Sequence, residues 1–156
     1  MEKDGENFYR QLADASRTEG LQKIFEMLAN EEVKHTKVIE GMKRNIRETL
    51  LEDSPILDNV TNVFQNMKKL RQPLHIDATT ETEMYRKARD IEKASREFYQ
   101  NKAEESENQH QKQLLLKLAA EEAKHLRIME NIVEFVSRPE PGNWLENAEW
   151  THIEPY

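Results

Sequence analysis

The chain has 156 residues, of which 37% are hydrophobic and 34% charged, and its formal charge at neutral pH is −7. This length suits one compact domain or two small, closely packed repeats. The acidic balance excludes a protein that follows nucleic-acid phosphates with a basic stripe, and it suits a protein that attracts cations. There is no cysteine, which excludes disulfides, thiolate zinc sites and iron–sulfur or rubredoxin-type centres within this chain.

The sequence also lacks the usual membrane and secretion signals. No apolar run approaches the roughly 20 residues of a membrane span. The first ten residues, "MEKDGENFYR", contain no apolar core of a signal peptide. We therefore expect a cytoplasmic protein with neither a membrane nor a nucleic-acid partner.

Glycine and proline are scarce, which predicts long uninterrupted helices. The first segment, residues 1–49, reads as a helical hairpin. Its first helix is expected over about residues 1–16, the stretch "RTEG" with Gly20 forms the turn, and the second helix continues to about Thr49.

A crossover, residues 50–79, follows the first hairpin. Ser54 reads as an N-cap and Pro55 as the first helical residue, which predicts a short helix inside this crossover. The crossover is long enough to carry the chain from one end of a bundle to the other.

The second hairpin is expected over residues 80–137. Thr80 followed by Glu83 has the pattern of a capping box, and the first helix of this hairpin should end near Glu105. The stretch "SENQHQ" forms the turn, and the last helix should end near Ser137, before the prolines of the tail. The tail, residues 138–156, carries both tryptophans, which predicts a C-terminal arm packed on the bundle.

The chain repeats itself at an offset of ninety residues. "MEKDGENFYRQLADAS" aligns with "IEKASREFYQNKAEES", and "FEMLANEEVKHTKVIE" aligns with "LLKLAAEEAKHLRIME", without gaps. The alignment superposes these pairs: Glu2 with Glu92, Tyr9 with Tyr99, Glu32 with Glu122, and His35 with His125. We interpret the chain as a duplicated unit, and the fold class as an all-α four-helix bundle of two helical hairpins joined by a long crossover.

Two apolar stripes at helical spacing each contain one Glu-x-x-His motif. The stripe of the second predicted helix consists of Leu21, Phe25, Leu28, Glu32, His35, Ile39, Met42 and Ile46. The stripe of the last helix consists of Leu115, Leu118, Glu122, His125, Met129, Ile132 and Val136. A lone buried histidine is more often hydrogen-bonded in a core, and a lone glutamate is usually solvated. Two copies at matched depth favour a metal site over these ordinary interpretations, because glutamate and histidine are costly to bury without partners.

Residues three positions apart lie on one face of a helix, so the glutamate and the histidine of each motif can reach the same metal site. The first helix of each hairpin adds one matched carboxylate. The candidate metal ligands are therefore Glu2, Glu32, His35, Glu92, Glu122 and His125. Four carboxylates and two imidazoles match the dimetal pattern of helical bundles, and this donor set suits iron or manganese better than structural zinc.

Six neighbouring residues are not assigned as ligands. Tyr9 and Tyr99 share the ligand face, as ordinary core aromatics or as groups whose hydroxyls orient a carboxylate. Glu31 and Glu121 precede the ligand glutamates and turn about 100° away on the helix, so we expect both to be solvated. The lysines of "EEVKH" and "EEAKH" are expected on outer faces.

These motifs, over residues 1–137, resemble the rubrerythrin branch of the ferritin-like superfamily. The resemblance implies a carboxylate-bridged diiron centre. In that centre the bridging ligands would be Glu32 and Glu122, the terminal carboxylates Glu2 and Glu92, and the histidines His35 and His125, one for each iron. Characterised rubrerythrins reduce hydrogen peroxide, whereas ferritin relatives oxidise and store ferrous iron.

The sequence departs from that family pattern in three places. The rubredoxin domain is missing, so electrons would come from an external donor such as a rubredoxin. Ser95 stands where rubrerythrins have an additional glutamate. Only one residue precedes Glu2, so we expect this ligand on a frayed first turn and the stripe from Ile39 to Ile46 covered by the crossover helix or a second subunit.

The expected function is that of a non-haem diiron oxidoreductase that reduces peroxide or dioxygen, coupled to oxidation of ferrous iron. Its cofactor would be two iron ions, with manganese or zinc as possible substitutes, and the protein would form a homodimer. The alternatives are an iron-binding protein that forms no cage, a structural or interaction bundle without turnover, and a manganese catalase or an oxygenase on the same scaffold.

Overall fold

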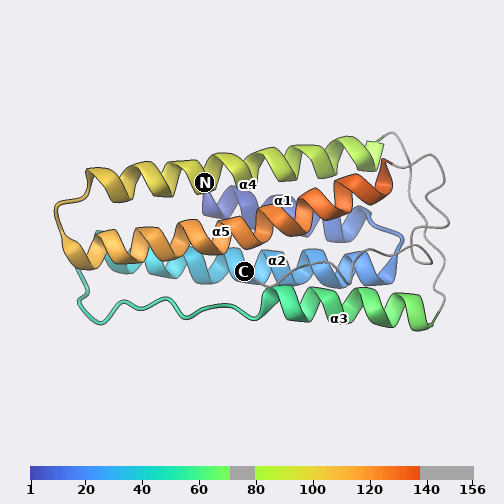
Figure 1. Ribbon diagram of the computed structural model, residues 1–156, viewed down its shortest axis with the longest axis horizontal. Coiled ribbons are helices and arrows are strands. Elements are labelled where there is room, and N and C mark those ends of the chain that lie inside the picture. Colours follow the sequence, from blue (N-terminus) through green and yellow to red (C-terminus); the bar gives the residue numbers. More distant parts are fainter. Residues whose placement is uncertain (71–79, 138–156) are drawn as a thin grey trace.

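The computed structural model describes residues 1–70 and 80–137, which contain five helices and no strand (Figure 1). The helices are α1 (Glu2–Ala15), α2 (Glu19–Lys43), α3 (Ile56–Lys69), α4 (Thr80–Glu105) and α5 (Gln109–Val136). Helices α1, α2, α4 and α5 form the bundle, and α3 lies alongside α2 (Figure 1). This architecture confirms the predicted all-α class. Among the described helices, none is both long and apolar enough to cross a membrane.

The second hairpin follows the local signals of the sequence closely. Helix α4 begins at Thr80, so this residue is already helical rather than the cap before the helix. Helix α5 begins at Gln109, where the side chain of Asn108 accepts the backbone N–H of Gln111 at 3.0 Å. This cap satisfies one of the backbone donors that every helix start leaves free.

Helix α2 ends at Lys43, six residues before the predicted end at Thr49. Asn45 adopts a left-handed conformation with φ of 53°. The backbone N–H of Ile46 donates to the carbonyl of Gly41 at 3.0 Å, and that of Asn45 donates to Met42 at 3.0 Å. These two bonds form a Schellman motif, which ends the helix although the apolar spacing continues.

Gly20 lies in the first turn of α2 and not in the preceding turn, where the sequence had placed it. The chain reverses over residues 16–18 instead. A Cβ atom on Gly20 would lie 2.1 Å from the sulfur of Met67 in α3. The glycine is therefore required for the close approach of α3 to α2.

The crossover helix α3 starts one residue later than predicted. Pro55 is its N-cap, and the hydroxyl of Ser54 accepts the N–H of Ile56 at 3.2 Å. The helix buries one stripe against the bundle, consisting of Ile56, Val60, Phe64 and Met67. Each fully buried side chain of this kind contributes roughly 1.5–3 kcal/mol, which seats α3 beside the first half of α2. The segment 71–79 and the predicted C-terminal arm, 138–156, lie outside the described residues.

The apolar core consists of two clusters that lie on either side of the Glu-x-x-His motifs. Along α2 the larger cluster contains Leu21 to Ala29, and the smaller one contains Val38. Along α5 the order is reversed, with Leu118 in the smaller cluster and Met129 in the larger. The polar motifs therefore lie at mid-bundle, between two apolar layers.

We predict that Gly20→Ala lowers the free energy of unfolding by roughly 1–2 kcal/mol, although alanine is the better helix former. The added methyl group would force Met67 and α3 away from α2. Urea denaturation measures the loss. In a Met67→Ala background the same substitution should become neutral or stabilising, and an unchanged penalty there would contradict the contact.

Candidate metal centre

The structure brings all six candidate ligands together at the middle of the bundle. Each of the four bundle helices contributes, and every one of the six side chains is buried. Helix α1 supplies Glu2, α2 supplies Glu32 and His35, α4 supplies Glu92, and α5 supplies Glu122 and His125. Residues from both hairpins thus share one volume from which water is excluded.

The two hairpins face each other through crossed contacts between histidine and carboxylate. Nδ1 of His35 lies 2.8 Å from Glu122 of the other hairpin and 3.4 Å from Glu2. Nδ1 of His125 lies 3.0 Å from Glu32. The two imidazole rings are nearly parallel, with centroids 5.3 Å apart and an interplanar angle of 11°.

The four motif residues are close enough to hold a metal ion. One ligand atom from each of Glu32, His35, Glu122 and His125 lies within 4.8 Å of the others. Within the described part of the chain, Oε2 of Glu122 and Oε2 of Glu2 are buried without a hydrogen-bond partner. Buried carboxylate oxygens of this kind fit a cation, because an unpaired acceptor is costly in a dry site.

The tyrosines bind carboxylates across the hairpins. The hydroxyl of Tyr9 donates to Oε1 of Glu92, and that of Tyr99 donates to Oε1 of Glu2. Both phenol rings are buried. Of the two interpretations that the sequence left open, these bonds favour hydroxyls that orient a carboxylate.

A family model matches the part of the chain that contains this cluster. A model of the family described as Rubrerythrin matches residues 1–133. The chain belongs to the rubrerythrin family. The match covers the first hairpin, nearly all of the second, and all six clustered residues. Comparisons with curated proteins and with solved structures each gave no significant match.

In this rubrerythrin-family chain, the pKa values of the buried carboxylates are shifted in opposite directions by burial and by their neighbours. Burial, together with the charge of Glu122, raises the pKa of Glu32 to about 8 and that of Glu92 well above its usual range. Burial also opposes ionisation of Glu122. Hydrogen bonds with Glu92, His125 and His35 outweigh it and hold the pKa of Glu122 well below its usual range.

The histidines of this rubrerythrin-family cluster hold their protons firmly. Burial disfavours the charged imidazole of His35, but the neighbouring carboxylates of Glu122 and Glu2 outweigh it and raise its pKa to about 10. The pKa of His125 is raised in the same way: burial opposes the charge, and the neighbouring carboxylates, Glu92 first, outweigh it. Protons therefore occupy positions between imidazole and carboxylate that a metal ion would take.

The expectation that Glu31 and Glu121 are solvated is wrong, since both are buried. Oε1 of Glu121 accepts the Lys124 ammonium at 2.7 Å and the backbone N–H of Ser54 at 3.3 Å. Lys124 also donates to the carbonyl of Ser54 at 3.1 Å. The start of the crossover therefore lies over α5 and removes Glu121 from water.

The equivalent ion pair of the first hairpin, between Lys34 and Glu31, is more exposed to solvent. Lys34 contacts Glu31 at 2.9 Å, but the Lys34 side chain is 60% exposed against 20% for Lys124. Ligand atoms of Glu31 and Glu121 also lie within 4.8 Å of one on His35. The sequence contained a signal for these ion pairs, because Glu and Lys recur three residues apart in "EEVKH" and "EEAKH". It contained none for their burial, which depends on the path of the crossover.

We predict that Glu121→Ala lowers the free energy of unfolding by about 1–3 kcal/mol, because it leaves a largely buried ammonium without its carboxylate. Glu31→Ala is the matched control and should cost less than about 1 kcal/mol, since Lys34 is mostly in solvent. Thermal or urea denaturation of the two variants measures the difference. Equal losses would contradict the asymmetry between the hairpins.

We predict that divalent metal binding releases protons and strengthens as the pH rises from about 6 to 8. Glu32 and His35 hold their protons at pH 7, because their pKa values are raised to about 8 and about 10. A metal ion requires both groups deprotonated. Calorimetry with Mn²⁺ in two buffers of different ionisation enthalpy detects the protons. A binding enthalpy that does not depend on the buffer would contradict this prediction.

Proposed function

We propose that this protein is a non-haem diiron oxidoreductase that reduces peroxide or dioxygen, coupled to oxidation of ferrous iron. The observation that carries the proposal is the convergence of four buried carboxylates and two buried imidazoles at mid-bundle. Membership of the rubrerythrin family supports the same conclusion.

The donor set supports iron as the resident metal. Four carboxylate charges balance two divalent ions, so the loaded cluster can remain in a dry core at low electrostatic cost. Carboxylate oxygen and imidazole nitrogen without thiolate are ligands that iron and manganese accept. We propose two iron ions, for which manganese or zinc can substitute in vitro.

Distances within the cluster support different roles for the carboxylates. Glu122 faces both histidines, with oxygens 2.8 Å from Nδ1 of His35 and 3.5 Å from Nδ1 of His125. Glu32 likewise faces His125 at 3.0 Å and His35 at 3.9 Å. Because each of these carboxylates lies between the two imidazoles, Glu32 and Glu122 would hold both metal ions, as the resemblance to rubrerythrins implies for bridging ligands.

The other two carboxylates lie toward the ends of the cluster. Glu2 is 3.4 Å from His35, and Glu92 is 3.6 Å from His125. We assign them as terminal ligands, one for each metal ion. Tyr99 and Tyr9 each hold one oxygen of these carboxylates, which leaves the second oxygen for the metal.

Two ferrous ions held by these residues would supply two electrons to peroxide or dioxygen. The chain's own residues position the ions and keep the surroundings dry. The crossed histidine–carboxylate contacts hold the ligand side chains of the two hairpins together, and the two apolar clusters flank the site on either side. The sequence has no cysteine to relay electrons, so we propose an external donor protein such as a rubredoxin. A cytoplasmic location and the absence of nucleic-acid partners stay predictions.

The first test is the iron content after anaerobic loading with ferrous iron and desalting. We expect about two irons per chain in the wild type, and loss of both in Glu32→Ala or Glu122→Ala, because a bridging ligand serves both ions. The control is Glu97→Ala, which removes an exposed glutamate of α4 and should bind iron normally. Iron content near zero in the wild type would contradict the dinuclear site.

The second part of the test is turnover of the loaded protein. Oxidation of added ferrous iron, followed by absorbance with peroxide or dioxygen as oxidant, should exceed the rate in buffer and disappear in His125→Ala. A protein that holds two irons but oxidises none would be an iron-binding bundle and not an oxidoreductase.

A further inference from the structure

A second group of possible metal ligands lies beside the candidate centre and consists of Glu31, Glu121 and His35. One ligand atom from each of the three residues lies within 4.8 Å of the others. Glu31 and Glu121 occupy equivalent positions of the repeat, ninety residues apart, on α2 and α5. We call these two glutamates the outer pair.

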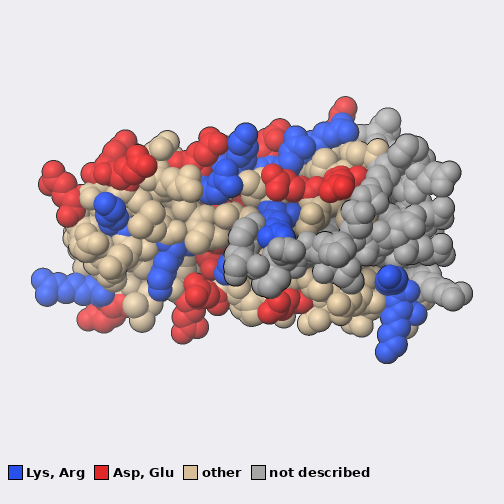
Figure 2. Space-filling model, in the orientation of Figure 1, with Lys and Arg blue, Asp and Glu red and all other residues tan. Residues whose placement is uncertain are grey.

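The outer pair differs from most acidic residues of the chain in its burial. On the face shown in Figure 2, acidic side chains lie interspersed with lysines and arginines, where water and salt screen their charge. Glu31 and Glu121, in contrast, are only 8% and 2% exposed. Two carboxylates held so close together away from water repel each other, and a cation between them removes that repulsion.

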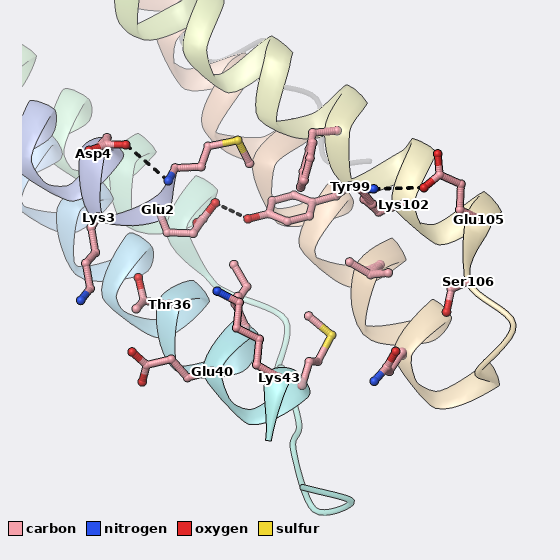
Figure 3. Close-up of a pocket in the computed structure, with 16 residues that line it drawn as sticks. Glu2, Lys3, Asp4, Thr36, Glu40, Lys43, Tyr99, Lys102, Glu105 and Ser106 are labelled. Carbon is pink, nitrogen blue, oxygen red and sulfur yellow. Dashed lines mark hydrogen bonds and ion pairs between the residues drawn. The ribbon is translucent and has the colours of Figure 1, made fainter. Parts of the chain in front are cut away.

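His35 has one nitrogen engaged at the candidate centre and one that is not. Its Nδ1 lies 2.8 Å from Glu122 and 3.4 Å from Glu2, which Tyr99 also binds (Figure 3). Within the part of the chain that the structure describes, its Nε2 is buried without a hydrogen-bond partner, and so is Oε2 of Glu121. Imidazole nitrogen and carboxylate oxygen are donors that a divalent transition-metal ion accepts.

Two lysines already contact the outer pair, each through one oxygen of a carboxylate. Lys34 lies 2.9 Å from Oε1 of Glu31, and Lys124 lies 2.7 Å from Oε1 of Glu121. The two ammonium groups compete with a metal ion for the same negative charge. We therefore expect an ion at the outer pair to bind more weakly than an ion at the centre.

A cleft of about 500 Å³ reaches the outer pair from solvent. It lies between α2 and the start of the crossover, and its lining includes Glu31 and Ser54. The charged residues of its described lining are three acids and two lysines, namely Glu31, Glu52, Asp53, Lys34 and Lys37. The excess of acids favours the entry of cations.

We propose that Glu31, Glu121 and Nε2 of His35 form an entry site, where an incoming divalent transition-metal ion such as ferrous iron binds before it passes to the centre. A neutral imidazole has only one nitrogen lone pair for a metal. His35 therefore holds an ion either at the entry site through Nε2 or at the centre through Nδ1, and the entry site releases its ion as the centre fills. The transfer rests on the proposed function, whereas binding by the outer pair does not.

Equilibrium dialysis against Co²⁺, from about 1 µM to 1 mM, tests the entry site in Glu122→Ala, which disables the centre. Dialysis retains weakly bound ions that desalting removes. We expect about one ion per chain, and binding weaker by roughly tenfold or more once Glu121→Gln is added. The control Glu130→Gln changes an exposed glutamate of the same helix and should leave the ion bound. A folded Glu122→Ala protein that binds no ion, or whose ion Glu121→Gln does not weaken, would overturn the proposal.

Loading of the intact centre provides an independent measurement. By stopped-flow absorbance of Co²⁺, Glu121→Gln should fill the centre roughly fivefold more slowly than the wild type, with the same final metal content. Lys34→Met removes a competing charge and should speed loading, which a purely structural role of the outer pair would not produce. Circular dichroism checks the fold of each variant.

Equal loading rates in the wild type and both variants would overturn the entry site. A wild type that holds no pair of ions, beside a Glu122→Ala variant that binds one ion through Glu121, would contradict the proposed function alone.

Discussion

Burial of four carboxylates and two imidazoles at the centre of a helical bundle is the constraint on which the rest of the structure depends. Groups of this kind are tolerated away from water only with partners. The shortest of these contacts join the two hairpins, because the carboxylate nearest to His35 is Glu122 and the one nearest to His125 is Glu32. The polar centre therefore joins the two hairpins, whereas the apolar clusters on either side of it keep it dry.

The residues that surround the six buried ligand candidates are also held by hydrogen bonds. Glu92 and Glu2 are each held by a tyrosine of the opposite hairpin, so that the hydrogen bonds cross the bundle in both directions. Glu121 and Lys124 form hydrogen bonds with the backbone of Ser54, which holds the start of the crossover over α5. A protein that places ionisable groups in its core in this way must also order the residues around them, which is what pre-organises a metal site.

The two hairpins of the duplicated chain are not equivalent in their outer charges. The crossover shields the Glu121–Lys124 pair but leaves Lys34 in solvent, so the two hairpins differ in how firmly their outer charges are held.

The sequence by itself determined the helical class, the duplication and the six candidate ligands, because helical periodicity is local and a repeated Glu-x-x-His can be read from spacing alone. It also contained the end of α2, in the form of Asn45, although the apolar spacing beyond it suggested a longer helix. Only the tertiary structure decided which tyrosine binds which glutamate, why Gly20 must have no side chain, and that Glu31 and Glu121 are buried. Those features depend on how segments far apart in the chain face each other, and local propensity carries no information about that arrangement.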